Sequence, residues 1–325
     1  MTSQRDVFIG NLFERAKEDK NIILISVDMG ASSLDRWREE LPEQFIPAGI
    51  SEQNAINLAA GLSAAGKKVY VYFMAAWSAR CFEQVRYSCA MGKNPITILG
   101  NGVALGYAPA GPAHNPNEDM AYMRTLCGIE IYSPSNNSMV ESLIELTIKE
   151  PKLRYLRLER KQAAVMEDAY PKWATGPAAI KSGMSIIKPG LAEPRHPNKP
   201  KICILSSGYM LGRAIEVWQE LLSEGHQISV VDLWRVKPIE PSIFKHTIEE
   251  YDIIITVEEQ TLSGAFGSAV LEALSDIGLK KDVLRIGLPE RYLFENGDRD
   301  HLIDNNGLSV ESMKEKILNY LKDLE

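Results

Sequence analysis

The sequence contains few of the residues that build disulfide frameworks and metal clusters. It has four cysteines and five histidines in 325 residues. The cysteines form no CxxC pair, and no histidine stands beside one at the spacing of metal ligands. A disulfide scaffold is therefore excluded, and we expect no metal cluster made by this chain alone. The default expectation is a set of buried thiols in a reducing cytoplasm, namely Cys81, Cys89, Cys127 and Cys203.

Long apolar runs and concentrated positive charge are also lacking. No apolar stretch approaches the length that crosses a membrane. The first 21 residues are charged throughout, which is typical of an amphipathic helix rather than of a signal peptide. The formal net charge of −7 argues against a nucleic-acid backbone as the main partner. We expect a soluble, cytoplasmic protein that binds neither nucleic acid nor membranes.

The sequence does contain short apolar runs that alternate with helical patterns. Such alternation predicts an α/β fold of βαβ units with a parallel sheet. In the first half of the chain the strand-like runs are residues 22–27, 69–73, 96–99, 129–132 and 153–158, and the helical patterns are 51–65, 79–92, 117–126 and 136–149.

A proline-rich stretch without hydrophobic period, residues 188–201, interrupts this series and is typical of a linker. A second alternating series follows, with strand-like runs at 202–207, 228–233, 253–258 and 283–288. We therefore predict two consecutive parallel-sheet α/β domains, residues 1–187 and 202–325.

Parallel sheets bind ligands beyond the carboxyl ends of their strands. Unusual residues gather at these positions in the first predicted domain. They include a long loop rich in Gly, Pro and Ala, and a loop of this length in a well-patterned domain is usually functional. The candidates are Asp28 after the first strand, Glu52 at a helix start, Trp77 and Arg80 after the third strand, and His114 in the loop 100–120.

Glu52 has two interpretations on residue chemistry alone. It follows Ser51, a good N-cap, and opens a helix of small apolar residues. An acidic group in a first turn is favoured by the helix dipole, so a solvated capping charge is the simple interpretation. The alternative is a carboxylate placed for chemistry.

Several segments resemble the transketolase family of thiamine diphosphate enzymes. They are "FIPAGISEQNAINLAAGLSAAGKKVYVY", "CFEQVRYSCA", "GPAHNPNEDMAYMR" and "YSPSNNSMV" in the first predicted domain, and "VVDLWRVKPIE" and "VEEQTLSGAFGSAV" in the second. The resemblance covers nearly the whole chain in order. It implies a pyrimidine-binding domain followed by a transketolase C-terminal domain.

The resemblance assigns a cofactor role to Glu52. In similar enzymes this glutamate is hydrogen-bonded to the pyrimidine ring nitrogen of thiamine diphosphate, so that the cofactor's own imino group becomes the base. Trp77 falls where such enzymes stack an aromatic ring on the pyrimidine, and Met74 and Arg80 are expected beside the same cofactor. A core indole for Trp77 and an apolar core role for Met74 are the alternatives.

The resemblance also implies substrate contacts. His114, in "GPAH", matches a histidine that donates to substrate oxygens and assists proton transfer, against the alternative of a solvated loop histidine. Arg160 matches an arginine that binds a substrate phosphate, against a plain surface role. Asp28 is expected to contact the cofactor or to close a dimer, or to be only a turn residue.

One part of the family pattern is missing. Similar enzymes hold the diphosphate and its Mg²⁺ through a Gly-Asp-Gly motif on another domain, whereas "NGDRD" at 296–300 lacks the third glycine and is interpreted as a turn. The chain therefore resembles the C-terminal half of a split transketolase. We expect an N-terminal transketolase subunit as partner, with two copies of each chain in an α₂β₂ heterotetramer.

The implied reaction is transfer of a two-carbon ketol unit between sugar or sugar phosphate substrates. Gly102 and Ala110 stand where sugar-phosphate transketolases carry a histidine and an aspartate, which suggests a smaller or deoxygenated acceptor because each lost hydrogen bond is worth about 1 kcal/mol. Two alternatives stay open: the β subunit of a 2-oxo acid dehydrogenase, and a non-catalytic binding subunit of the same fold.

Overall fold

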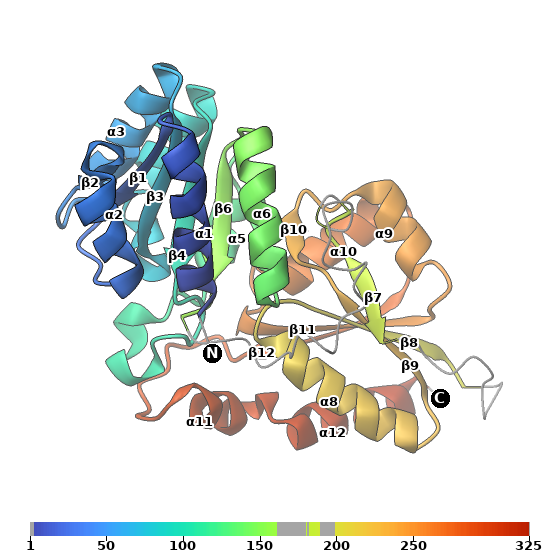
Figure 1. Cartoon of the computed structure of the whole chain (residues 1–325). Coiled ribbons are helices and arrows are strands. Elements are labelled where there is room, and N and C mark those ends of the chain that lie inside the picture. The colour runs from blue at the N-terminus through green and yellow to red at the C-terminus, as the bar shows by residue number, and fades with distance from the viewer. Residues whose placement is uncertain (1–2, 161–179, 181, 189–198, 325) are drawn as a thin grey trace.

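The structure is a computed structural model that describes residues 3–160, 180, 182–188 and 199–324. Most of the predicted linker, at 189–198, lies outside the described residues. The first part of the chain forms α1 (Gln4–Glu18), β1 (Ile22–Ser26), η1 (Ser32–Leu34), α2 (Asp35–Glu40), η2 (Pro42–Gln44), β2 (Phe45–Pro47), α3 (Glu52–Ala64), β3 (Lys68–Met74), η3 (Ala75–Ala79), α4 (Phe82–Gln84), η4 (Val85–Met91), β4 (Ile96–Asn101), η5 (Ala108–Ala110), η6 (Pro112–His114), α5 (Asp119–Arg124), β5 (Glu130–Tyr132), α6 (Asn137–Lys149) and β6 (Arg154–Leu158) (Figure 1).

The second part begins with an additional strand ahead of the predicted series. Its elements are β7 (Ser185–Lys188), β8 (Lys201–Ser206), α8 (Met210–Ser223), β9 (Gln227–Asp232), β10 (Arg235–Lys237), α9 (Pro241–Ile248), β11 (Ile253–Thr261), α10 (Phe266–Asp276), β12 (Asp282–Leu288), α11 (Arg299–Ile303), η9 (Asp304–Leu308) and α12 (Val310–Asp323). The two mostly parallel α/β sheets confirm the predicted fold class. Among the described residues, no helix combines the length and apolarity needed to cross a bilayer.

The first sheet has seven strands in the order β10-β5-β6-β4-β3-β1-β2. All neighbouring pairs are parallel except β10 with β5. The five residues of β1 are all buried, as expected for an interior strand covered on both faces. After β1 the chain crosses to β2 on one side and then returns to β3 on the other, which makes a topological switch point at the end of β1.

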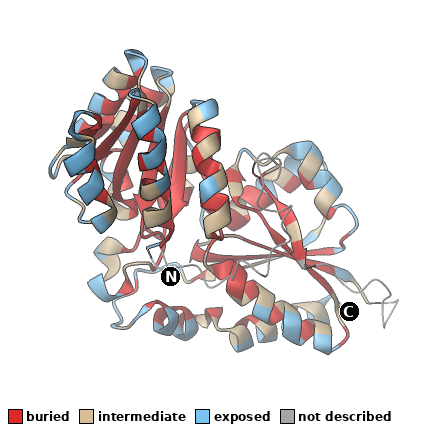
Figure 2. Ribbon diagram, in the orientation of Figure 1, coloured by how far each residue is buried: buried red, intermediate tan, exposed pale blue. Residues whose placement is uncertain are grey.

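Helices cover both faces of this sheet. On one face α1 packs against α6, and Phe8 and Leu143 join the core there. On the other face α3 and η4 pack together, and Ala55 and Val85 lie in a second core. Figure 2 shows buried strands between helices whose outer faces are exposed. This layering leaves the strand ends as the open part of the domain.

The second sheet has five strands in the order β12-β11-β8-β9-β7, with β7 antiparallel to β9. The helix α8 packs on β8 and β9, and α12 packs on α8. Because β7 belongs to this sheet, residues 185–187 of the predicted first domain and residue 188 of the predicted linker lie with the second group of strands.

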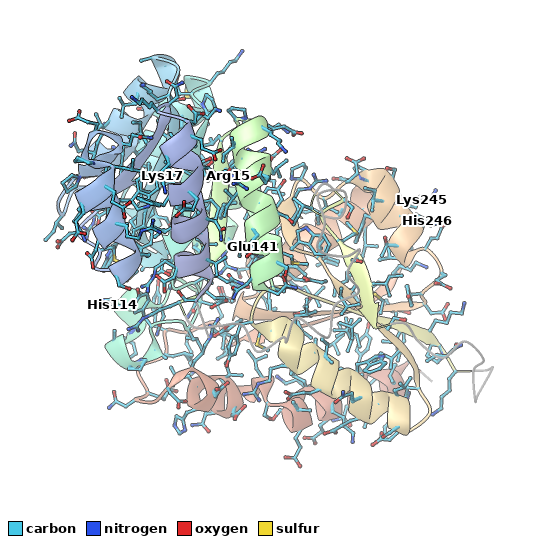
Figure 3. The ribbon with its side chains drawn as sticks, in the orientation of Figure 1. Arg15, Lys17, His114, Glu141, Lys245 and His246 are labelled. Carbon is cyan, nitrogen blue, oxygen red and sulfur yellow. The ribbon has the colours of Figure 1, made fainter. Side chains whose placement is uncertain are left out.

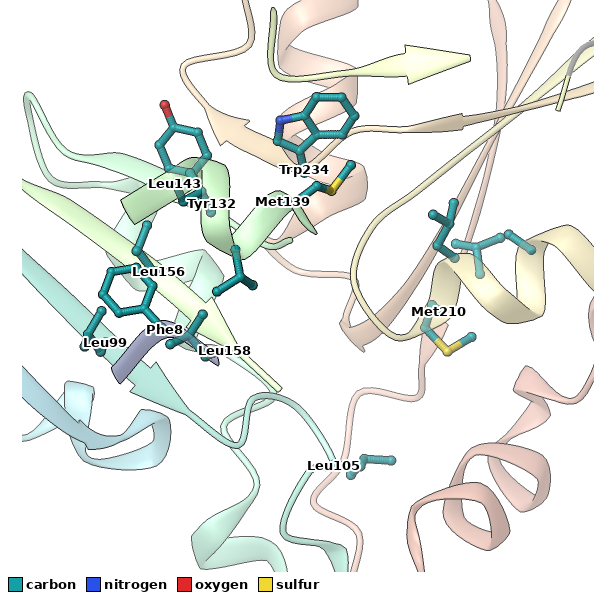
Figure 4. Close-up of a cluster of buried hydrophobic side chains, with 14 of the residues drawn as sticks. Phe8, Leu99, Leu105, Tyr132, Met139, Leu143, Leu156, Leu158, Met210 and Trp234 are labelled. Carbon is teal, nitrogen blue, oxygen red and sulfur yellow. The ribbon is translucent and has the colours of Figure 1, made fainter. Parts of the chain in front are cut away.

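The two parts of the chain share a β-sheet and a hydrophobic core. The strand β10 leaves the second part and pairs with β5 at the edge of the first sheet. Ahead of it, the buried Trp234 packs near Tyr132 and Met139 (Figure 4). The Trp234 carbonyl accepts the Ser133 amide at 2.7 Å. One buried apolar cluster extends from Phe8 to residues of the second part such as Met210 and Trp234. The second part is therefore built into the core of the first.

Side-chain caps begin several of the helices, and two expectations need correction. Ser3, Asn136 and Ser309 cap α1, α6 and α12, each by accepting a backbone N–H. Ser51 lies at the N-cap of α3, but its hydroxyl donates to the Ala48 carbonyl at 2.7 Å instead of capping. The expectation of uniformly buried thiols is wrong for Cys127, which is exposed in a loop after α5.

Candidate active site

The candidate residues lie beyond the carboxyl ends of β1, β3 and β4. Asp28 follows β1, η3 carries Trp77 directly after β3, and the loop after β4 carries His114. In Figure 3 His114 lies below the first sheet, in the loop segment on the side of α11, and α11 contacts η5 of the same loop. The parallel sheet thus brings together residues that are distant in sequence.

Glu52 is a buried carboxylate at the first position of α3. Its side chain is only 3% exposed. Its ion-pair partner is Arg80, whose Nη1 lies 3.0 Å from Oε2 and whose side chain is 47% exposed. Burial raises the pKa of the neighbouring Cys81 thiol to about 12, and the Glu52 carboxylate adds to that shift. A solvated capping charge does not describe Glu52, because the carboxylate is enclosed.

Trp77 joins Arg80 and His114 into one cluster with Glu52. The Arg80 guanidinium carbon lies 5.0 Å from the centre of the Trp77 ring. The Trp77 and His114 rings meet edge to face, with centroids 5.4 Å apart and an angle of 64° between the planes. Trp77 is partly exposed rather than enclosed in the core. The structure therefore brings Glu52, Trp77, Arg80 and His114 together through pairwise contacts.

Unpaired polar atoms concentrate in the loop that follows His114. Nδ1 of His114, both side-chain polar atoms of Asn115 and Oδ1 of Asn117 are buried and have no hydrogen-bond partner among the described residues. Buried polar atoms of folded proteins are nearly always paired, so a group of unpaired ones needs an explanation. Donors and acceptors that face a ligand provide one.

Among the described residues, the remaining predicted site residues make no hydrogen bond, ion pair or ring contact with this cluster. Met74 ends β3 just before η3 and is 9% exposed, while Asp28 is exposed with φ of 35°. Asp28 makes no hydrogen bond or ion pair with any described residue. Arg160 does not contact Glu52, Trp77 or His114; it lies over the ring of Tyr107, 4.6 Å from its centre.

A buried ion pair fixes the far end of the active-site loop. Asp119, fully buried at the start of α5, accepts from Nε and Nη2 of Arg157 at 2.9 and 3.0 Å. The Tyr155 hydroxyl donates to the same carboxylate at 2.8 Å. Bidentate arginine pairs of this kind hold a fixed geometry. The active-site loop is therefore attached to β6 at Asp119, a few residues after His114 and Asn115 in the sequence.

A second buried ionic cluster lies between the two parts of the chain, and sequence reasoning missed it. Arg299 of α11 contacts Glu159 at 2.6 Å and Glu259 at 2.6 Å, and its guanidinium lies over the Tyr209 ring. Burial disfavours the charged forms, but the two carboxylates outweigh it and raise the pKa of Arg299. Glu259 also accepts the Leu105 amide, which ties the active-site loop to this cluster.

The "NGDRD" segment has a different structure from the expected turn. Asp298 accepts the His301 amide at 2.9 Å and caps α11, and the next residue is Arg299 of the ionic cluster. The segment therefore begins a helix that holds the two parts of the chain together. A local sequence pattern offered no signal for this, since the partners of Arg299 are 140 and 40 residues away.

Comparison with known proteins assigns the chain to a family. The profile of the transketolase pyrimidine binding domain matches residues 3–165, and that of the transketolase C-terminal domain matches residues 190–313. The chain belongs to the transketolase family.

Relatives of two kinds are found. The chain is similar to one of the subunits of apulose-4-phosphate transketolase of Phocaeicola vulgatus, with 29% identity over 99% of this chain and 98% of that protein. It is 27% identical to 1-deoxy-D-xylulose-5-phosphate synthase of Methylacidiphilum infernorum, of which it spans about half, 48%. Among solved structures, a split gene transketolase described as an inactive beta4 tetramer superposes with a TM-score of 0.83 over 99% of both chains at 24% identity, which supports the fold.

Proteins of this family use thiamine diphosphate, and the residues of the site fit its pyrimidine end. An enclosed carboxylate suits a ring nitrogen, a partly exposed indole suits a flat ring, and the unpaired Nδ1 of His114 points to a polar ligand. For the metal, no group of three or more His, Cys, Asp or Glu side chains among the described residues is placed to hold an ion.

Proposed function

We propose that this chain is the pyrimidine-binding subunit of a split transketolase, which transfers a two-carbon ketol unit between sugar or sugar phosphate substrates in the cytoplasm. The observation that carries the proposal is the cluster of Glu52, Arg80, Trp77 and His114 at the carboxyl ends of parallel strands. Similarity along nearly the whole length to a protein named as a transketolase subunit supports the same assignment.

Each residue of the cluster has a defined task in this proposal. Bound thiamine diphosphate supplies the carbon that carries the two-carbon unit. Glu52 holds a proton at the pyrimidine nitrogen, and Trp77 presents its indole to the pyrimidine face. Arg80, which pairs with Glu52, neutralises the carboxylate until that proton is shared.

His114 and Arg160 serve the substrate. The imidazole can donate to a substrate oxygen or accept its proton, because one of its ring nitrogens has no partner among the described residues. Arg160 binds an anionic group such as a phosphate. Met74 and Asp28 line the cofactor side of the site in this proposal.

The partner subunit would hold the diphosphate and Mg²⁺. Support comes from the relatives, a protein named as one subunit of a transketolase and a split gene transketolase, and from the span of only half of the single-chain synthase. Large apolar side chains are also exposed on or just before α3, which begins at Glu52, and on η4, which packs against α3: Ile50, Leu58, Tyr87 and Met91, between 36% and 75% exposed. Apolar patches of this kind mark association surfaces.

The assembly test uses the mixed subunits. We expect two copies of each chain, an α₂β₂ tetramer with two equivalent sites, by light scattering. The isolated chain should bind thiamine diphosphate with Mg²⁺ weakly in calorimetric titration. Tight binding by this chain alone, or a fully active one-to-one heterodimer, would contradict the proposal.

The chemical test is Glu52→Gln in the assembled complex. The amide keeps the shape of the side chain but cannot share a proton as a carboxyl does, so turnover should fall by about a hundredfold or more. Exchange of the cofactor C2 proton, followed by NMR, should slow in parallel. Glu141→Gln, at an exposed glutamate of α6 (Figure 3), is the matched control. Unchanged exchange in Glu52→Gln would favour a non-catalytic binding subunit.

A further inference from the structure

Gly102 and Tyr107 are spatially coupled in the active-site loop. Gly102 has φ of +71°, and a Cβ added there would lie 2.0 Å from Cε2 of the Tyr107 ring. Atoms cannot approach so closely, so the ring occupies the volume that any side chain at position 102 would need. Only glycine at 102 permits this placement of Tyr107.

The ring of Tyr107 is held from two sides. Nδ2 of Asn101, a fully buried residue at the end of β4, donates to the Tyr107 hydroxyl at 2.8 Å. The guanidinium of Arg160 lies over the ring face, 4.6 Å from the centroid. Burial raises the pKa of the Tyr107 phenol, so the hydroxyl stays protonated at neutral pH.

Arg160 follows a firmly held stretch of backbone. The adjacent Glu159 pairs with Arg299, and the Glu159 amide donates to Oε1 of Gln4 at 3.0 Å. Within the part of the chain that the structure describes, no carboxylate lies within ion-pair distance of Arg160. Arg160 is an exposed residue, so among the described residues nothing prevents an anionic ligand from reaching it.

We propose that Tyr107 is a positioning residue that holds the Arg160 guanidinium for an anionic group of the substrate, and that Gly102 is required for this placement. A guanidinium over an aromatic face keeps the N–H groups at its edge available for bidentate binding of a phosphate. Tyr107 then sets the preference for a phosphorylated acceptor. This inference rests on the proposed function.

The test compares two acceptors in the assembled complex. The ratio of kcat/KM for D-ribose 5-phosphate to that for D-ribose measures the preference for phosphate. Tyr107→Leu removes the aromatic face and should lower this ratio by about two- to fivefold through KM, the range for an exposed cation–π contact. Tyr107→Phe keeps the face and should retain the ratio.

A double-mutant cycle separates positioning from a general structural role. Arg160→Gln alone should remove most of the preference, and adding Tyr107→Leu to it should change the ratio no further, because the two residues act through one contact. Gly102→Ala displaces the ring from the other side and should reproduce Tyr107→Leu, which covers the case that the leucine variant fails to fold.

The outcomes distinguish this inference from the proposed function. Equal losses for both acceptors in Tyr107→Leu, additive effects in the cycle, or a wild-type complex without phosphate preference would overturn the role of Tyr107 while leaving ketol transfer intact. A wild-type complex, assembled and loaded with cofactor, that converts no sugar with any ketol donor would instead overturn the proposed function itself.

Discussion

Two buried carboxylate sites in this chain differ in how completely they are paired. Glu159 and Glu259 share Arg299 through four contacts between 2.6 and 3.2 Å, with all three side chains almost fully enclosed. Glu52 is equally enclosed, but its carboxylate has one hydrogen-bonding side-chain partner among the described residues, the half-exposed Arg80.

The difference separates a site built for rigidity from one built for a ligand. Buried charges without sufficient partners are costly, and they persist where a ligand or a reaction uses them. Nδ1 of His114 and the side-chain polar atoms of Asn115, which have no partner among the described residues, resemble Glu52 in being incompletely paired. The Arg299 cluster holds one end of the active-site loop, because Glu259 accepts the Leu105 amide. At the other end of the loop, beside the Glu52 cluster, polar groups are left available to a ligand.

Removing the cation of the fully paired site should have the largest effect. Arg299→Met leaves two buried carboxylates without their cation, so the free energy of unfolding should fall by about 3–5 kcal/mol. Urea denaturation measures it. Arg213→Met is the matched control, because its partners Asp300 and Asp304 are 58% and 46% exposed and their ion pairs are worth at most about 1 kcal/mol. Similar losses of unfolding free energy in both variants would show that the buried Arg299 cluster stabilises the fold no more than the exposed ion pairs of Arg213 do.

The next largest effect is a pH dependence of the free energy of unfolding, caused by Glu258, which precedes Glu259 of the Arg299 cluster in the sequence. Burial raises the pKa of Glu258 to about 7, although its carboxylate accepts the Phe266 and Gly267 amides. A folded-state pKa above the unfolded one stabilises the protein at low pH, and this contribution is lost as the pH rises from about 4.5 to 7.

The shift in the pKa of Glu258 from 4.5 to about 7 corresponds to a change in the free energy of unfolding of about 3 kcal/mol across this pH interval. Glu258→Gln cannot titrate, so the difference in unfolding free energy between wild type and variant should change across this interval and be flat above it. Denaturation series at several pH values measure this difference. A constant difference between pH 4 and 8 would show that Glu258 ionises in the folded state as it does in the unfolded chain.

A smaller effect, on cofactor binding, is expected at the Glu52 cluster. Trp77→Ala removes the indole beside Arg80 and His114 without emptying a core, so folding should be retained. The loss of aromatic stacking should raise the KM for thiamine diphosphate in the complex by about tenfold, which corresponds to about 1.4 kcal/mol. Trp77→Phe keeps a ring and should lose less. A core role for Trp77 would appear instead as a lower melting temperature with an unchanged KM.

The sequence predicted the elements whose signals are local. Alternation of apolar strands and amphipathic helices placed β1, β3, β4 and β6, and the direction of parallel strands explains why Glu52, Trp77 and His114 converge. These residues follow different strands, but all of those strands end at the same edge of one sheet.

The rest depended on contacts between distant segments. Arg299 resembles any surface arginine in sequence, because its partners Glu159 and Glu259 come from other elements. Tyr107 acquires its role only through the backbone conformation of Gly102, which no composition or period reveals. The three-residue β10 is too short to show the period of a strand.

The edge strand β10 also limits how this protein can be divided. Cutting the chain between the two parts would remove β10 from β5 and expose the backbone amides and carbonyls of that edge, a template for pairing with other chains. It would also expose the pocket of Trp234. An interruption between the two parts would therefore yield two aggregation-prone fragments, so the two parts are constrained to stay within one polypeptide.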